Sequence, residues 1–224
     1  DLHSFPTRRS SDLVQPGTSV KLTMKRGEST VDFTIVRAQV SDPSVRWSVS
    51  DGVGTMIISR FDAQTASLAR QAASELKSQG VKAVIVDLRD NGGGYLNAAR
   101  DVAGIWLNNQ IVVTEKAGDK VTDEVKTGSS AILDGMKTIL LVNRDSASAS
   151  EILAGALQEH GKATLVGQKT FGKGTVQKVL NLADGRLLKV TVARWYTPKG
   201  KNITKEGIDR KSTRLNSSHG SASR

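Results

Sequence analysis

The chain has 224 residues, a net charge of +10 and a hydrophobic fraction of 38%, which is enough apolar material for a packed core. It contains no cysteine, which excludes disulfides and thiolate metal sites, and no apolar run approaches the ~20 residues that span a bilayer. The basic residues form no compact run and only 4% of residues are aromatic, so a solvated basic surface is favoured over nucleic-acid binding.

Both ends of the chain lack the hydrophobic period of its middle. Residues 1–13 and 209–224 resemble translated sequencing-library adapters, so we expect them to be non-native flanks of a polypeptide that is cut at both ends. Ordinary polar disordered tails are the alternative interpretation. Two of the three histidines, His3 and His219, lie in these flanks, and the net charge without the flanks is +7.

The first predicted unit is a β-hairpin. Residues 20–25 and 30–36 alternate apolar and polar side chains around a short loop that contains Gly27, a pattern typical of two paired strands. Two strands alone are rarely stable. We therefore expect the hairpin to be the remainder of a larger unit or to pack on the next part of the chain.

The following segments alternate between strands and helices. Strands are predicted at 54–61, 83–89, 111–114, 138–142 and 163–166, with a pair of long strands at 174–182 and 186–196. Helices are predicted at 63–79, 95–107 and 149–159. Two of the strands are almost continuously apolar, as strands buried on both faces are. This order predicts the α/β fold class, with a layered, parallel-rich sheet and helices.

Histidine is the usual general base of hydrolases, and His160 is the one histidine outside the flanks. It follows Ser148 by 12 residues of predicted helix, which is about 18 Å along the helix axis. That distance excludes a local Ser–His pair, and one histidine without cysteine makes a poor zinc site. His160 is expected to interact with the dipole at the C-terminal end of its helix.

Three serines separated by alanines, Ser146, Ser148 and Ser150, join a buried strand to a helix. Small residues at such a turn suit the close approach of a substrate backbone. Ser148 and Glu151 also fit the Ser-x-x-Glu capping box, so a plain N-cap role for Ser148 is the structural alternative.

Lys173 is framed by Gly172 and Gly174 just before a predicted strand. An ordinary lysine is protonated at neutral pH, but burial can lower the pKa of a lysine by several units and make it a base for a serine hydroxyl. Gln177 follows four residues later, on the same side of a strand, where its amide could orient the lysine. A surface turn is the ordinary interpretation of Gly-Lys-Gly.

Residues 92–94 are three glycines in a predicted strand-to-helix turn. Such a turn can present backbone N–H groups to an anion, either a phosphate or the oxyanion of a tetrahedral intermediate. The Walker and dinucleotide-binding spacings are absent. A tight turn that needs positive φ is the structural alternative, and one glycine would satisfy it.

Three segments in series resemble the carboxyl-terminal processing peptidases, also called tail-specific proteases. They are DLRDNGGG at 87–94, VNRDSASASEI at 142–152 and GQKTFGKGTVQ at 167–177. The resemblance implies a peptidase core of the tail-specific protease type at 39–208 and the C-terminal remnant of a PDZ domain at 14–38.

The resemblance implies that Ser148 is the nucleophile, Lys173 the base and Gln177 the residue that positions the lysine. The implied function is a serine endopeptidase that cleaves proteins near their C-terminal tails by a Ser–Lys dyad, through an acyl-enzyme. No metal and no organic cofactor is implied.

The resemblance further implies an oxyanion hole formed by the backbone amides of Ala149 and Gly94, with Gly93 as the rival to Gly94. The implied partners are protein or peptide substrates with accessible C-terminal tails, and an adaptor or a second copy of the chain; nucleic acid is not among them. The implied location is the bacterial cell envelope or periplasm.

Two rival functions stay open from the residues alone. A non-catalytic peptide-binding module could hold chain termini on the same scaffold, although it would be free to lose Ser148, Lys173 or Gln177. A phosphate-binding enzyme would use the triple-glycine turn, but the chain lacks a companion lysine-serine pair or an acidic metal cluster.

Overall fold

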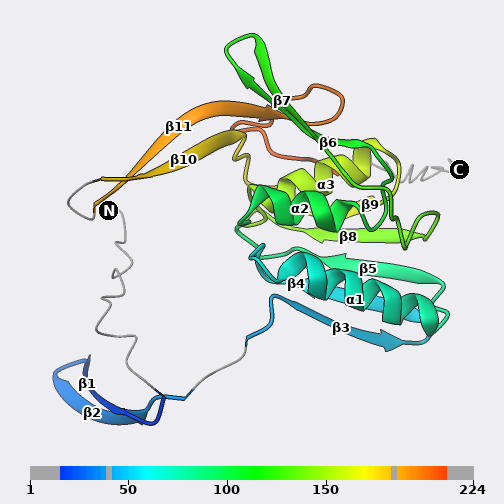
Figure 1. Ribbon diagram of the computed structural model, residues 1–224. Coiled ribbons are helices and arrows are strands. Elements are labelled where there is room, and N and C mark those ends of the chain that lie inside the picture. The colour runs from blue at the N-terminus through cyan, green and yellow to red at the C-terminus, as the bar shows by residue number, and fades with distance from the viewer. Residues whose placement is uncertain (1–15, 39–41, 183–185, 211–224) are drawn as a thin grey trace, which may run out of the picture. The chain divides into compact units, whose positions relative to one another are not determined.

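The computed structural model separates the chain into two compact units, with the boundary between Asp42 and Pro43 (Figure 1). It describes residues 16–38, 42–182 and 186–210. We describe each unit by itself, and the domain limits expected from the sequence stay predictions.

Some expectations concern residues outside the described part. The flank expected at 1–13 lies there, as does the flank expected at 209–224 from residue 211 onward, and with them His3 and His219. Within the described part, every helix is too short or too polar to cross a membrane.

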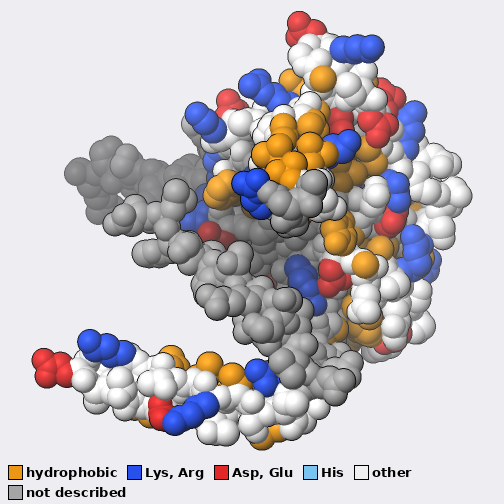
Figure 2. Space-filling view, turned by 60° about the vertical axis from the view of Figure 1, so that its left-hand side comes forward, with side chains coloured by type: hydrophobic (Ala, Val, Ile, Leu, Met, Phe, Trp, Pro, Cys, Tyr) orange, Lys and Arg blue, Asp and Glu red, His pale blue; other side chains and the backbone are white. Residues whose placement is uncertain are grey.

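The smaller unit is a two-stranded hairpin, as predicted. Strands β1 (Ser19–Arg26) and β2 (Ser29–Val36) pair in antiparallel register. One face is apolar because the cross-strand partners on it are Val20 with Ile35, Leu22 with Phe33, and Met24 with Val31. Most of these side chains are exposed, and Figure 2 shows a row of hydrophobic side chains on this unit. The assignment of the hairpin to a PDZ domain stays a prediction.

The larger unit contains a five-stranded sheet in the order β3-β4-β5-β8-β9. Its strands are β3 (Val45–Ser50), β4 (Val53–Ile58), β5 (Ala83–Asp87), β8 (Thr138–Val142) and β9 (Thr164–Gly167). Strand β3 runs antiparallel to β4, and the other neighbours are parallel. The parallel-rich sheet is therefore confirmed, and β3 is a strand that the sequence analysis did not predict.

A second, four-stranded sheet is antiparallel throughout, in the order β10-β11-β6-β7. Its strands are β6 (Ile111–Ala117), β7 (Lys120–Lys126), β10 (Thr175–Asn181) and β11 (Leu187–Tyr196). The long pair β10–β11 was predicted. Strand β7 was not, because most of its side chains are polar and exposed at the sheet edge.

Three helices of the described residues lie around the parallel sheet (Figure 1): α1 (Thr65–Ser78), α2 (Leu96–Ala103) and α3 (Ala149–Glu159). Helix α1 packs on β3 and β4, α2 contacts both α1 and α3, and α3 also contacts β6 and β9. Residues 149–157 of α3 are all buried, as expected for a helix that is covered on all sides. Helix α2 ends earlier than predicted, at Ala103, with Gly104 as its C-cap.

The parallel strands determine where the site forms. Because β4, β5 and β8 run in the same direction, their carboxyl ends meet at one edge of the sheet. The turns that follow them, at 59–62, 88–95 and 143–148, lie side by side at that edge. Backbone hydrogen bonds join these turns directly, from Phe61 N–H to Gly93 O at 3.0 Å and from Ala147 N–H to Asn91 O at 3.0 Å.

The buried position of Leu153 in α3 gives a direct test of this packing. Leu153 is fully buried, so Leu153→Ala should lower the free energy of unfolding by about 2–5 kcal/mol. Val121→Ala, on the exposed edge strand β7, should lower it by less than about 1 kcal/mol. Urea denaturation of the two variants measures both values, and equal losses would contradict the assignment of α3 to the core.

Candidate active site

Ser148 has an unusual backbone conformation at the start of α3. Its φ is +56° and its ψ is −114°, in a region that costs a non-glycine residue roughly 1–3 kcal/mol. The residue does occupy the N-cap, as the capping-box motif predicted. An ordinary N-cap has extended backbone angles, however, so capping alone gives no reason for this conformation.

The two neighbouring serines have structural roles. Ser146 and Ser150 are fully buried. The Ser146 hydroxyl donates to Leu88 O at 2.8 Å, and the Ser150 hydroxyl donates to Asn91 O at 2.9 Å. Ser148 is only half-buried and lines a cavity of about 470 Å³. The structure thus separates one accessible serine from two that tie its turn to the turn after β5.

Glu151 joins the Ser148 turn to the Lys173 loop. Its carboxylate is fully buried and accepts four hydrogen bonds. Oε2 accepts from Ser148 N–H at 2.8 Å and from Lys173 N–H at 2.9 Å. Oε1 accepts from Thr170 Oγ1 at 2.6 Å and from Gly172 N–H at 2.7 Å. Burying a carboxylate costs free energy unless its oxygens accept hydrogen bonds. The four donors therefore stabilise the buried Glu151 side chain, and Glu151 in turn fixes the positions of the four donors.

Lys173 and Gln177 line the same cavity as Ser148. Lys173 is half-buried and lies just before β10, and its carbonyl accepts a hydrogen bond from Trp195 Nε1 at 2.9 Å. Gln177 is exposed. The register of β10 against β11 shifts between Val176 and Gln177, with Val192 of β11 as the extra residue. Lys173 lies before the start of β10, so strand alternation alone does not describe how the Lys173 and Gln177 side chains are related. Within the described residues, no hydrogen bond joins the Ser148, Lys173 and Gln177 side chains.

The glycines beside Lys173 are required by close packing. A Cβ at Gly172 would lie 2.9 Å from Lys205 C, and Gly172 has a φ of +92°. A Cβ at Gly174 would lie 2.7 Å from Thr204 Oγ1 and 2.9 Å from Thr204 N. Both glycines are buried. The surface-turn interpretation of Gly-Lys-Gly is therefore wrong, because the loop packs against the segment near the C-terminal end of the described chain.

Two of the three glycines in the turn after β5 are also close to other backbone. A Cβ at Gly93 would lie 2.7 Å from Ser148 Cβ and 2.9 Å from Ala149 N. A Cβ at Gly94 would lie 2.0 Å from Phe61 O. Both have positive φ, whereas Gly92 has open space around it. One glycine with positive φ does not account for this motif, because a Cβ would collide with neighbouring atoms at both Gly93 and Gly94.

The backbone amides of this turn differ in their partners. Gly93 N–H donates to the Asn91 side chain at 2.9 Å. No acceptor among the described residues takes the N–H of Gly94 or of Ala149. Both residues line the cavity that contains Ser148. Two backbone donors thus remain available at the wall of the cavity.

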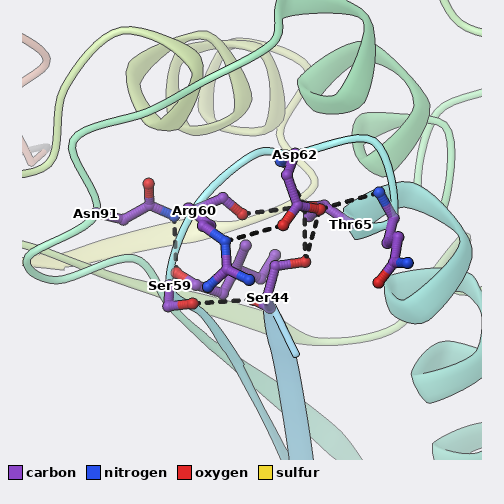
Figure 3. Close-up of polar contacts among 8 residues, drawn as sticks. Ser44, Ser59, Arg60, Asp62, Thr65 and Asn91 are labelled. Atoms are coloured by element: carbon purple, nitrogen blue, oxygen red, sulfur yellow. Dashed lines mark hydrogen bonds and ion pairs between the residues drawn. The ribbon is translucent and has the colours of Figure 1, made fainter. Parts of the chain in front are cut away.

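A polar cluster holds the turn after β4 in place (Figure 3). Ser44 Oγ donates to Asp62 Oδ1 at 3.1 Å, Asp62 N–H donates to Thr65 Oγ1 at 2.8 Å, and Arg60 Nε donates to Asp62 Oδ2 at 2.9 Å. Partial burial raises the pKa of Asp62, but hydrogen bonds from the start of α1 and from Ser44 outweigh it and leave the pKa below its usual value. The cluster fixes the position of Phe61, which contacts the glycine turn.

His160 is far from this chemistry, as predicted. It is the C-cap residue of α3, and its Nε2 lies 2.8 Å from Ile111 O. Among the described residues, no group of three or more His, Cys, Asp or Glu side chains is arranged to hold a metal ion.

Sequence reasoning missed two residues that organise the site. Glu151 was recognised only as part of a capping box, although its place just before the apolar run 152–157 was a signal that it needs several partners. Asn91 was recognised only as part of a glycine-rich motif, and no local pattern shows that its side chain reaches Ile58 O.

Comparisons with known proteins show what the chain is similar to. A family model described as Peptidase family S41 matches residues 52–212. A "Probable CtpA-like serine protease" of Staphylococcus haemolyticus is 41% identical over 195 residues, which cover 86% of this chain and 39% of that protein. A protein of the same name from Staphylococcus epidermidis is 40% identical over 196 residues, covering 86% of this chain and 40% of that protein. The chain thus spans about two fifths of the length of these relatives.

The fold of this chain is also similar to that of a solved structure. The photosystem II D1 C-terminal processing protease matches with a TM-score of 0.71 and 31% sequence identity. The match covers 88% of this chain and 55% of that protein.

The positive φ of Ser148 predicts that glycine is more stable than alanine at this position. Because φ is positive there, Ser148→Gly should have a free energy of unfolding higher than that of Ser148→Ala by about 1 kcal/mol. At Gln71, an exposed position inside α1, glycine should be less stable than alanine by a similar amount. Thermal or urea unfolding of the four variants gives both differences, and the same order at the two sites would contradict a strained Ser148.

The four hydrogen bonds of Glu151 predict a large effect from a small substitution. Glu151→Gln turns one buried acceptor into a donor that faces N–H or O–H groups, so it should lower the free energy of unfolding by about 2–4 kcal/mol. Glu75→Gln, whose carboxylate accepts from Trp47 Nε1 on the surface of α1, should cost less than about 1 kcal/mol. Chemical denaturation measures both free energies of unfolding. A Glu151→Gln variant as stable as the parent would contradict the role of Glu151 in joining the two loops.

Proposed function

The chain belongs to peptidase family S41, and on that basis we propose that it is a serine endopeptidase with Ser148 as nucleophile and Lys173 as general base. The observation that carries the proposal is the backbone of Ser148, a non-glycine residue at φ +56° in a strand-to-helix turn. Strained serines at such turns expose their hydroxyl for nucleophilic attack in other hydrolases. Lys173 lines the same cavity and is the base that the resemblance implies.

The proposed reaction has two stages. The amine of Lys173 accepts the proton of the Ser148 hydroxyl while Oγ attacks the carbonyl carbon of a peptide bond. The tetrahedral intermediate collapses when the leaving amine takes this proton from the lysine, and an ester on Ser148 remains. Water then gives a proton to the same lysine and attacks the ester carbonyl, and the Ser148 Oγ takes that proton as it leaves, which restores the enzyme. Gln177, on the wall of the same cavity, orients the lysine through its side-chain amide.

The proposed oxyanion hole consists of the backbone N–H groups of Gly94 and Ala149. Three observations support Gly94 over its rival Gly93: the Gly93 N–H is already bound by Asn91, the Gly94 N–H has no acceptor among the described residues, and Gly94 lines the cavity. Each such donor lowers the barrier by about 3 kcal/mol in enzymes of this kind. These steps involve no metal and no organic cofactor.

The proposed substrates are proteins or peptides with accessible C-terminal tails. The name of the D1 C-terminal processing protease, which is 31% identical, supports this class. Part of the cavity wall is apolar, formed by Leu96, Ile152, Val176 and Trp195, and would accept an apolar side chain next to the cleaved bond. A PDZ remnant at 14–38, an adaptor or second copy as partner, and a cell-envelope location are further proposals that come from the resemblance.

The test uses an unstructured protein with an apolar C-terminal tail and follows its fragments by mass spectrometry. The parent chain should cleave it, Ser148→Ala should not, and Lys173→Met should lower kcat by about 10²–10⁴-fold. Lys178→Met removes an exposed lysine of β10 that does not line the cavity, and it should cleave like the parent.

Two results would overturn the proposal. Cleavage by Ser148→Ala at the parent rate would exclude Ser148 as the nucleophile. Binding of the tail without cleavage by the parent chain would instead identify a peptide-binding module.

A further inference from the structure

Asn91 is a fully buried polar residue that connects three segments around the candidate site. Its Nδ2 donates to Ile58 O at the end of β4 at 2.7 Å, and its Oδ1 accepts from Gly93 N–H at 2.9 Å. Its backbone carbonyl accepts from Ala147 N–H at 3.0 Å and from the Ser150 hydroxyl at 2.9 Å. A buried amide is stable only when its polar groups are paired, and here both side-chain atoms are.

The side chain of Asn91 acts on the peptide that carries a proposed oxyanion donor. The carbonyl of Gly93 accepts a hydrogen bond from Phe61 N–H at 3.0 Å. In a trans peptide the C=O and the following N–H point in opposite directions, so this bond turns the Gly94 N–H away from Phe61. The N–H of Gly93, on the preceding peptide, is held by Asn91. Two anchors therefore define the orientation of the Gly93–Gly94 peptide.

A peptide between two glycines needs such anchors. Gly93 and Gly94 have φ values of +99° and +146°, and glycine reaches many other conformations at little cost. If the anchor at Gly93 N–H is lost, rotation of the Gly93–Gly94 peptide becomes easier. Rotation would direct a carbonyl oxygen to the place where the negative oxygen of the intermediate must be stabilised.

Asn91 also holds the second proposed donor. Its backbone carbonyl binds Ala147 and Ser150, which flank Ser148 and Ala149 in the chain. Hydrogen bonds of one residue, Asn91, thus hold both turns that carry the amides of the proposed oxyanion hole, although the two turns are more than 50 residues apart in sequence.

We propose that Asn91 is the positioning residue of the oxyanion hole, and that its side chain holds the Gly93–Gly94 peptide in the orientation that directs Gly94 N–H at the reacting carbonyl. The inference rests on the proposed function. Asn91 does not touch the substrate; it acts through Gly93. Its loss should therefore weaken binding of the tetrahedral intermediate and leave binding of the uncleaved peptide unchanged.

The test compares Asn91→Leu, which removes both side-chain hydrogen bonds and keeps the branch at Cγ, with Asn91→Asp, which keeps an oxygen for Gly93 N–H. Asn91→Leu should lower kcat by about 10²-fold with KM changed by less than about threefold. Its affinity for a peptide boronate, which forms a tetrahedral adduct with the serine, should fall by the same factor. Asn91→Asp should lie between Asn91→Leu and the parent in both measurements, and it serves as the second variant if Asn91→Leu does not fold.

The matched control is Thr138→Val at the opposite end of β8. It removes a buried hydrogen bond from Trp106 Nε1 to Thr138 Oγ1 of 2.9 Å, so it should reduce stability without changing kcat or boronate affinity. Binding of the uncleaved peptide, measured in a Ser148→Ala background, should be the same with and without Asn91→Leu.

The outcomes separate the inference from the function on which it rests. Parent-like boronate affinity in the folded Asn91 variants, or a loss confined to KM, would overturn the positioning role while the peptidase assignment stands. A parent chain that neither cleaves peptide nor binds boronate through Ser148 would overturn the proposed function and this inference with it.

Discussion

The buried carboxylate of Glu151 is the interaction on which the rest of the site depends. It lies in the first turn of α3, where the partial positive charge of the helix end favours an anion. Its four hydrogen bonds join the turn that carries Ser148 to the loop that carries Lys173. These bonds also help to offset the backbone strain of about 1–3 kcal/mol at Ser148. Together with the backbone hydrogen bond from Phe171 N–H to Ser146 O at 3.1 Å, they fix the position of one loop relative to the other.

The other half of the site is built in the same manner, with backbone donors held by a buried polar side chain. Here Asn91 connects the glycine turn to the turn that carries Ser148. Phe61 approaches the glycine turn so closely that only glycine fits at position 94. The parallel sheet brings these turns together because three of its strands end at the same edge. Small residues at the turns allow the backbone of one turn to contact the backbone of the next. The N–H groups of Gly94 and Ala149 have no acceptor among the described residues, and both residues line the cavity.

Local patterns predicted most of the fold but only part of the site. Strand β8 and helix α3 followed from their apolar runs, whereas the mostly polar, exposed strand β7 had no apolar period to reveal it. Ser148 and Lys173 could be paired only through the resemblance to a known family, since they are 25 positions apart with a helix and a strand between them. The roles of Glu151 and Asn91 depend on partners about 20 to 60 residues away in sequence, and no spacing rule for helices or strands reaches that far.

The role of Ser148 as nucleophile is decided by finding which serine of the chain forms an acyl-enzyme. The parent chain and a Lys173→Met variant are treated with an activated acyl ester, and the modified residue is identified by mass spectrometry of the fragments. We expect a single ester on Ser148, none on Ser146 or Ser150, and a rate of acylation that falls when the lysine amine is removed. Acylation of either neighbouring serine, or a rate at Ser148 that is the same in Lys173→Met, would contradict the assignment of these two residues.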